Sequence, residues 1–172
     1  MGTGKSAIGR GIARVVSGRH VDTDREIEQR FGMPVARIFQ EHGEQAFRAA
    51  EYDVLRMLAE ECSASDGRVI VSTGGGTPLR PENAELLRRA GTLVWLKASS
   101  DVILQRVMRK IDQRPLLADH ADNPRARIES LLADREPKYA ALAAYTIDTS
   151  TFPSPDDAAR SVVKTLGLSE ET

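Results

Sequence analysis

The chain has 172 residues, with 24 Lys and Arg against 25 Asp and Glu, and a formal net charge of −1. This length suits one domain with a core of its own, and the balanced charge argues against a nucleic-acid or anionic-membrane partner. The single cysteine, Cys62, excludes a disulfide framework within the chain, and no apolar run approaches the length of a membrane span. We therefore expect one cytoplasmic domain over residues 1–172, a monomer that binds neither nucleic acid nor membrane.

The first six residues, Met-Gly-Thr-Gly-Lys-Ser, match the second half of a phosphate-binding loop, G-x-x-x-x-G-K-[ST]. In that motif the loop N–H groups face the phosphates, the lysine (here Lys5) reaches the β- and γ-phosphates, and the serine (here Ser6) holds Mg²⁺. Gly2 and Gly4 would let the backbone approach an anion closely. The opening glycine of the motif and the strand before it are not in the sequence, so this stretch alone fits an ordinary helix-opening turn equally well.

The spacing of apolar residues predicts the elements that follow. Helices are expected over 5–17, around 27–31, from 33 to a break at Gly43, over 44–62 and 81–90, after a cap at Ser100 or Asp101, from Pro124 to Arg135 before Pro137, and from Ser154–Pro155 to Gly167. Strands are expected over 19–22, 68–72, 93–96 and 145–148. Helices alternating with short, continuously apolar strands predict an α/β domain with a parallel sheet. In such sheets ligands bind beyond the carboxyl ends of the strands.

Two aspartates follow the first predicted strand. Asp22 and Asp24 form a D-x-D pattern at its carboxyl end. A phosphate site needs a carboxylate for Mg²⁺, and Asp22 suits that role because the strand at 68–72 carries no acid. Asp24 could then accept a hydrogen bond from the hydroxyl that is phosphorylated. The alternative is that Thr23 or Asp24 only caps the next helix.

Three consecutive glycines, Gly74, Gly75 and Gly76, follow the strand at 68–72. Glycines lose more backbone entropy on folding than other residues, so three in a row need a reason. A backbone that approaches a ligand closely would be such a reason. A tight turn is the alternative.

Several arginines suit anion binding, each with a structural alternative. Arg48 has Glu44 and Glu51 at helical spacing, so it is either an exposed ion-pair ladder or an arginine held for an anionic substrate. Arg135 could instead be only a partner of the helix dipole. Arg114 lies in a long polar segment of the kind that forms lids, where it could neutralise a transferring phosphoryl group.

Together these residues resemble the shikimate kinase family. The resemblance rests on GTGKS followed by IGRGIA, then DTD, IE, G-x-P-V-x-x-IF, GE-x-x-FR-x-x-E, STGGG, RPLL and R-E-P-x-Y, in this order from Met1 to about Leu166. It implies a three-layer P-loop NTPase fold, related to the nucleoside monophosphate kinases, with a five-stranded parallel sheet flanked by helices. It also implies a substrate-binding region at about 23–62 and a lid at about 111–123. The implied reaction transfers the γ-phosphate of ATP, with Mg²⁺, to the 3-hydroxyl of shikimate, on the route to chorismate and the aromatic amino acids.

The family's pattern implies roles for individual residues. The residues implied to bind ATP and its phosphates are Gly2, Thr3, Gly4, Lys5, Ser6, Ala7, Arg106 and Arg114. Those implied to bind shikimate are Asp24, Arg48, Gly74, Gly75, Gly76 and Arg135. Ser6 and Asp22 would serve Mg²⁺, and Lys5, Asp24 and Arg114 would be catalytic.

The sequence departs from the family's pattern at its start, where members carry an apolar strand and then G-x-M-G-x-G-K-S. We expect the natural protein to begin further upstream, and a chain that truly starts at Met1 to bind ATP weakly and to have low stability. Two other functions are considered. Gluconate kinase shares the loop but lacks FR-x-x-E and the triple glycine followed by RPLL. A non-catalytic, shikimate kinase-like sensor domain would be expected to have lost Lys5, Asp24 or Arg114.

Overall fold

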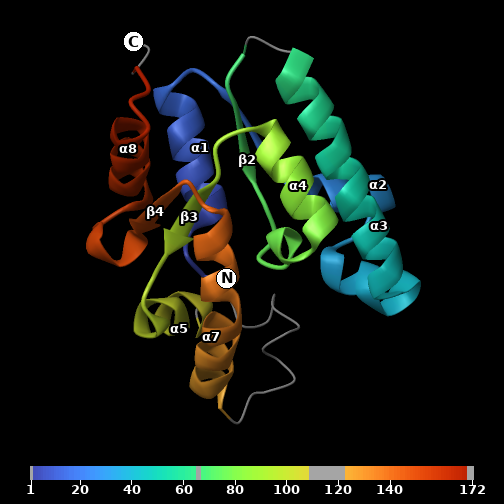
Figure 1. Ribbon diagram of the computed structural model, residues 1–172. Coiled ribbons are helices and arrows are strands. Elements are labelled where there is room, and N and C mark those ends of the chain that lie inside the picture. The colour runs from blue at the N-terminus through green and yellow to red at the C-terminus, as the bar shows by residue number, and fades with distance from the viewer. Residues whose placement is uncertain (1, 65–66, 109–122, 170–172) are drawn as a thin grey trace.

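The computed structural model describes residues 2–64, 67–108 and 123–169, in which helices and strands alternate (Figure 1). The elements in chain order are α1 (Lys5–Val15), β1 (Arg19–Asp22), α2 (Thr23–Phe31), α3 (Val35–Ala64), β2 (Val69–Ser72), η1 (Thr77–Leu79), α4 (Pro81–Ala90), β3 (Val94–Lys97), α5 (Ser100–Met108), α7 (Pro124–Leu142), β4 (Tyr145–Asp148), η3 (Thr149–Thr151) and α8 (Pro155–Thr165). The predicted α/β class and all four predicted strands are confirmed.

The strands form two parallel pairs. β1 pairs with β2, so that Asp22 lies opposite Ser72, and β3 pairs with β4, so that Lys97 lies opposite Asp148. Among the described residues no ladder joins β2 to β3. Because both pairs are parallel, each brings the carboxyl ends of two strands to one edge, which is where the polar residues of the sequence were expected to meet.

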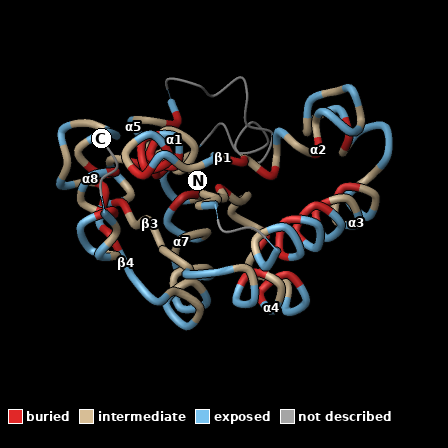
Figure 2. The backbone as a smooth tube through the Cα atoms, turned by 90° about the horizontal axis from the view of Figure 1, so that it is seen from above, coloured by how far each residue is buried: buried red, intermediate tan, exposed pale blue. Residues whose placement is uncertain are grey.

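Helices cover both sides of the strands. α1 and α8 pack around Ile12 and Val162 against Ile70 of β2 and Leu96 of β3. α2 and α3 form a second core against β1 and β2, on the side to which Val71 points. Figure 2 shows the buried positions running along α1 and along one side of α3. The strands are therefore apolar on both faces because both faces are covered, as their continuous apolar runs predict.

Close approach of α1 to its neighbours depends on two glycines. A Cβ at Gly9 would lie 2.7 Å from Ser72 Oγ, and a Cβ at Gly11 would lie 2.8 Å from Ala159 Cβ. α1 thus touches β2 on one side and α8 on another.

Several helix boundaries differ from the sequence-based expectation, and three of the differences have a clear structural description. α1 ends at Val15, two residues early, and Ser17 takes a positive φ of 48°. The cap of α5 is Ser99, whose Oγ accepts a hydrogen bond from the Val102 N–H, rather than Ser100 or Asp101. The predicted end at Arg135 is wrong, because α7 continues through Pro137 to Leu142. A proline removes one helical hydrogen bond, and packing of the following turn can outweigh that loss.

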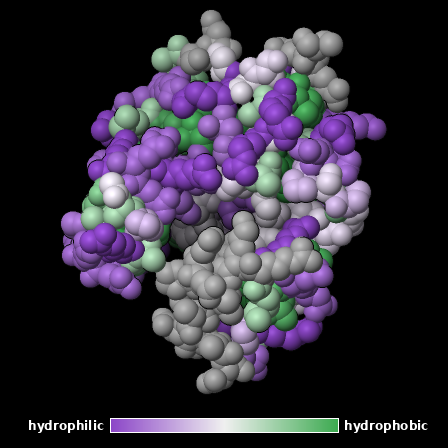
Figure 3. Space-filling model, turned by 180° about the vertical axis from the view of Figure 1, so that it is seen from behind, coloured by the Kyte–Doolittle hydropathy of each residue, from purple (hydrophilic) through white to green (hydrophobic). Residues whose placement is uncertain are grey.

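Gly43 interrupts α3 as predicted, with φ 78° and ψ 167° inside a segment that is otherwise helical. Within the described residues, no helix combines the length and apolar character that a membrane crossing requires. Figure 3 shows a face dominated by hydrophilic side chains, with apolar ones in small groups.

Candidate active site

The glycine loop opens α1. Gly4 is the N-cap residue, with φ 88°, and Gly2 has φ 71°, a left-handed conformation that favours glycine. A Cβ at Gly2 would also lie 3.1 Å from the side chains of Ile103 and Val107, so α5 leaves no room there. The loop therefore presents the N–H groups and the positive dipole end of a helix, which suits a phosphate.

Ser6 and Asp22 meet beside this loop. Ser6 Oγ donates a hydrogen bond of 2.5 Å to Asp22 Oδ2. The other oxygen of Asp22 accepts from the Asp24 N–H at 3.2 Å, so Asp22 is also the N-cap of α2. The capping role considered for Thr23 or Asp24 thus belongs to Asp22, and Asp24 keeps its carboxylate for other contacts.

Asp24 is the most perturbed acid of the site. Burial raises its pKa to about 6, the nearby charge of Asp22 adds to the rise, and the Lys5 ammonium opposes it. A carboxyl group with a pKa near 6 is ionised at neutral pH and is a stronger base than an ordinary aspartate. Asp24 is therefore suited to accept a proton from a substrate hydroxyl.

The glycines after β2 form a loop that touches two of the predicted site residues. A Cβ at Gly74 would lie 3.0 Å from Asp24 Oδ1, and a Cβ at Gly76 would lie 3.3 Å from both terminal nitrogens of Arg48. The carbonyl of Gly75 accepts a hydrogen bond of 2.5 Å from the Tyr139 hydroxyl. The absence of side chains thus lets one short loop lie against an acid at one end and a guanidinium at the other.

Arg48 is held by two carboxylates of different exposure. It lies 3.1 Å from Glu44 and 3.1 Å from Glu51, whose side chains are 65% and 1% exposed. Glu51 also accepts hydrogen bonds from Thr77 Oγ1 at 2.6 Å and Asn83 Nδ2 at 3.2 Å. The expected exposed ion pair is thus present between Arg48 and Glu44. Glu51, in contrast, is buried and holds Arg48 from the protein interior.

An open cleft of about 750 Å³ lies next to Arg48. Arg135 of α7 and Gly76 also line it, together with Arg80. The Nε of Arg135 is buried and has no hydrogen-bond partner. The carboxylates of Glu44, Asp53 and Glu82 line the cleft as well, and Glu44 and Glu82 pair with Arg48 and Arg80. The buried Nε of Arg135 without a partner is thus the clearest candidate for binding a carboxylate of a ligand.

Arg106 lies on the other side of the glycine loop. Its guanidinium donates to the carbonyl of Thr149 at 3.2 Å and lies 3.5 Å from the carbonyl of Gly2. The Thr149 hydroxyl in turn donates to the carbonyl of Thr3 at 3.2 Å. Arg106 of α5 therefore holds the glycine loop together with Thr149 of η3. Arg114 and the predicted lid at 111–123, all but its last residue, lie outside the described residues.

Four residues that hold the candidate site together were missed by sequence reasoning. Glu51 was treated only as half of an ion-pair ladder, and Thr77 and Asn83, its buried partners, received no role. Tyr139 was part of a quoted motif without a function, yet it holds Gly75. The signal for Glu51 was available, because Phe47, four residues before it, and Val54, three residues after it, lie on the buried side of the same helix.

A glycine loop at a helix N-terminus, a Ser–Asp pair beside it and an arginine-lined cleft at the same edge of a parallel α/β fold define a P-loop kinase that acts on a small acidic molecule. Comparison with known proteins gives the family. The family model described as shikimate kinase matches residues 1–167. The chain belongs to the shikimate kinase family of ATP-dependent kinases, and the predicted family and P-loop NTPase fold are confirmed.

Individual relatives agree. The shikimate kinase of Desulforudis audaxviator is 45% identical over 168 residues, which are 98% of this chain and 79% of that protein. The shikimate kinase of Thioalkalivibrio sulfidiphilus is 40% identical over 96% of this chain and 80% of its own length. Among solved structures, the shikimate kinase from Acinetobacter baumannii in complex with shikimate has a TM-score of 0.85 and 32% identity, covering 96% of this chain and 88% of that one. The enzyme from Bacteroides thetaiotaomicron also has a TM-score of 0.85, with 31% identity over 98% of this chain and 94% of that one.

Proposed function

We propose that this chain transfers the γ-phosphate of ATP to the 3-hydroxyl of shikimate, giving shikimate 3-phosphate and ADP. The observation that carries the proposal is the loop of Gly74, Gly75 and Gly76, which lies against Asp24 at one end and Arg48 at the other. A base for a hydroxyl and an anchor for a carboxylate are thus joined by one rigid backbone segment. Shikimate carries both groups on one small ring.

The acceptor's carboxylate is bound by Arg48 and Arg135, which line the same cleft. Glu51 holds Arg48 from the buried side, so the guanidinium is already oriented before a ligand arrives. The backbone of Gly74, Gly75 and Gly76 gives the ring a flat surface without side chains. Binding therefore fixes the distance between the carboxylate and the reacting hydroxyl.

Phosphoryl transfer follows from the position of Asp24. Its carboxylate accepts the proton of the 3-hydroxyl while that oxygen forms a bond to the γ-phosphorus, and the bond from the γ-phosphorus to the β–γ bridging oxygen breaks, releasing ADP. Lys5 and the N–H groups of Gly2, Thr3, Gly4, Ser6 and Ala7 offset the negative charge of the phosphates. Arg114 and the lid at about 111–123 would close over them, and Arg106 would lie on the adenine side.

Mg²⁺ fits the pair formed by Ser6 and Asp22. One hydroxyl and one carboxylate lie 2.5 Å apart beside the glycine loop, and Mg²⁺ in such sites takes few protein ligands besides phosphate oxygens and water. No cluster of three or more His, Cys, Asp or Glu side chains suited to a metal occurs in the part of the chain that the structure describes. When bound, Mg²⁺ supplies charge that neutralises the β- and γ-phosphates. The balanced charge of the chain argues against a nucleic-acid or anionic-membrane partner, and the single cysteine suits a reducing cytoplasm. A monomer remains our expectation.

The test is ADP release from Mg-ATP with shikimate, with gluconate or with no acceptor. Release that requires shikimate supports the proposal, release with gluconate supports the related kinase, and shikimate binding without release supports a sensor domain. A matched pair of variants tests whether Arg48 binds the acceptor. Arg48→Lys should raise KM for shikimate. Arg37→Lys, on the same helix but 62% exposed and paired with Glu41, should leave it unchanged.

A further inference from the structure

His20 of β1 takes no part in the proposed reaction, yet it lies beside the phosphate-binding loop. Side chains alternate along a strand, so His20 shares one side of β1 with Asp22, whereas Val21 between them belongs to the core under α2 and α3. Asp22 accepts the hydrogen bond from Ser6 in the first turn of α1. The α1 side of β1 therefore carries two polar side chains next to the helix that the loop opens.

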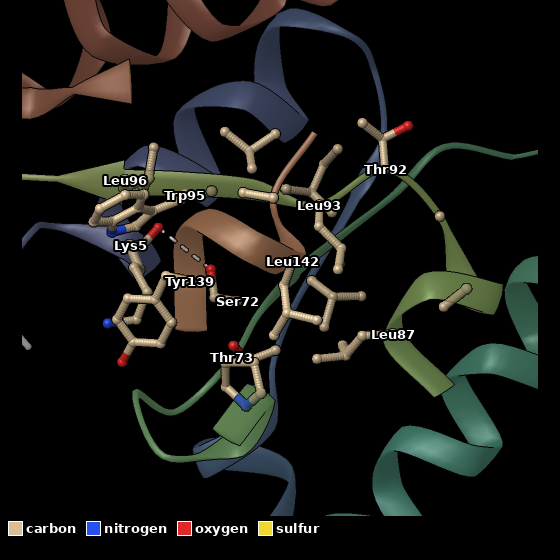
Figure 4. A pocket seen from close by; sticks show the side chains of 18 of the residues that line it. Lys5, Ser72, Thr73, Leu87, Thr92, Leu93, Trp95, Leu96, Tyr139 and Leu142 are labelled. Atoms are coloured by element: carbon tan, nitrogen blue, oxygen red, sulfur yellow. Dashed lines mark hydrogen bonds between the residues drawn. The ribbon is translucent and has the colours of Figure 1, made fainter. Parts of the chain in front are cut away.

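His20 is hydrogen-bonded to Ser72 of β2 underneath α1. Its Nε2 lies 2.9 Å from Ser72 Oγ. Ser72 is 6% exposed, and its Oγ also donates to the carbonyl of Lys5 at 3.3 Å, the contact drawn as a dashed line in Figure 4. A Cβ at Gly9 would lie 2.7 Å from both His20 Nε2 and Ser72 Oγ, so the backbone of α1 packs directly on this pair about one turn after Lys5. One histidine thus connects β1, β2 and the first turn of α1.

The hydrogen bonds of this group run in one direction. A carbonyl oxygen can only accept, so the single proton of the Ser72 hydroxyl serves Lys5. Ser72 Oγ is then the acceptor toward His20, and the ring N–H at Nε2 is the donor. We assign the Nε2–H tautomer from these partners. Because consecutive hydrogen bonds polarise one another, loss of the ring N–H also weakens the bond from Ser72 to Lys5.

We propose that His20 is a positioning residue for nucleotide binding, which acts through Ser72 on the backbone of Lys5. The carbonyl that Ser72 binds belongs to the peptide joining Lys5 to Ser6, and the Ser6 side chain is held separately by Asp22. Two side chains of β1, two residues apart, thus fix the turn that presents Lys5 and Ser6 to the phosphates. The inference rests on the phosphate-binding role proposed for this turn and does not depend on which acceptor is phosphorylated.

The test compares His20→Gln with His20→Met. The two new side chains have the same length, but only glutamine carries an N–H donor that can replace Nε2. The dissociation constant for Mg-ADP should be about fivefold higher in His20→Met than in His20→Gln, the effect of one lost hydrogen bond, while that for shikimate should differ by less than about twofold. Amide hydrogen exchange of residues 8 and 9 should be about fivefold faster in His20→Met. The control is His42→Met, which replaces an exposed histidine of α3 that packs on Phe31 and should change neither measurement.

A double-mutant cycle with Ser72→Ala tests the route. If His20 acts through Ser72, adding His20→Met to Ser72→Ala should change the dissociation constant for Mg-ADP by less than about twofold. Effects that multiply would overturn the proposal, and so would equal Mg-ADP affinity of the Gln and Met variants. An Nδ1–H tautomer of His20 in long-range ¹H–¹⁵N spectra at about pH 8, where the ring is neutral, would overturn it as well. If the parent chain binds no Mg-ADP, the proposed function fails, and the exchange rates and the tautomer then decide the role of His20 by themselves.

Discussion

Removal of the Glu51 carboxylate should destabilise the protein far more than removal of Glu44, although both acids bind the same arginine. Glu51 is 1% exposed and receives hydrogen bonds from Arg48, Thr77 and Asn83. In Glu51→Ala the hydroxyl of Thr77 and the amide of Asn83, both on residues with 0% exposure, lose this acceptor. Glu44 is 65% exposed, and its loss costs Arg48 one solvated ion pair.

The magnitude follows from burial. Breaking a buried ion pair by removing one partner costs about 3–5 kcal/mol. Because Arg48 is itself 25% exposed and keeps Glu44, we expect the lower end, about 3 kcal/mol. For a domain of this size that lowers Tm by about 6–12 °C. Glu44→Ala should cost about 0.5 kcal/mol and shift Tm by about 1–2 °C.

Differential scanning calorimetry of the two variants at pH 7 measures the difference, and steady-state kinetics give KM for shikimate at a temperature where both are folded. KM should rise more in Glu51→Ala, because Arg48 is no longer held from the buried side. Melting temperatures within about 2 °C of one another would refute the reasoning, since the buried partners of Glu51 would then contribute nothing beyond a surface pair.

Four further outcomes are expected. Gly76→Ala places a Cβ 3.3 Å from both terminal nitrogens of Arg48, so KM for shikimate should rise about tenfold, a change of about 1.4 kcal/mol, with little change in Tm. Burial raises the pKa of Asp24 to about 6 from 3.8, so kcat/KM should fall as pH drops below about 6. The raised pKa of Asp24 also makes the stability of the folded state depend on pH: its contribution is greatest below pH 3.8 and is lost as pH rises through about 6. The Tm of Asp24→Asn should therefore exceed that of the parent at pH 8 and equal it at pH 3.5. Equal Tm values at pH 8 would contradict this. Ser6→Ala removes the hydroxyl 2.5 Å from Asp22, so activity should need more Mg²⁺ for half-saturation, whereas an unchanged Mg²⁺ titration would exclude Ser6 as a ligand.

Local sequence patterns predicted most elements because their signals are local. Val69, Ile70 and Val71 form a continuous apolar run and indeed have helices on both faces. Gly43 marked the break in α3, and Ser154 marked the cap of α8. Pro137 led to a wrong prediction because proline disfavours a helix only locally. The remainder of α7 keeps the segment helical through this position.

The site was predictable in its residue types and not in its contacts. The D-x-D pattern and three glycines pointed to a site beyond the strand ends, but the meeting of Gly74 with Asp24 joins residues 50 apart in the sequence. Asp22 took the capping role that Asp24 had been considered for, because a residue that precedes the helix can reach its first N–H groups. The raised pKa of Asp24 arises mainly from burial, which a short motif does not encode.

The position of α1 has a consequence for how the protein loses activity on heating. α1 lies against β2, where Gly9 admits Ser72, and against α8, where Gly11 admits Ala159, so it bridges two units that share no ladder in the described residues. We expect local opening to follow the strand pairs, with the less stable pair opening first. Opening of either strand pair removes part of the surface against which α1 packs. Lys5 and Ser6, in the first turn of α1, then lose their position in the site. Thermal inactivation should therefore precede global unfolding and report the stability of the weaker pair.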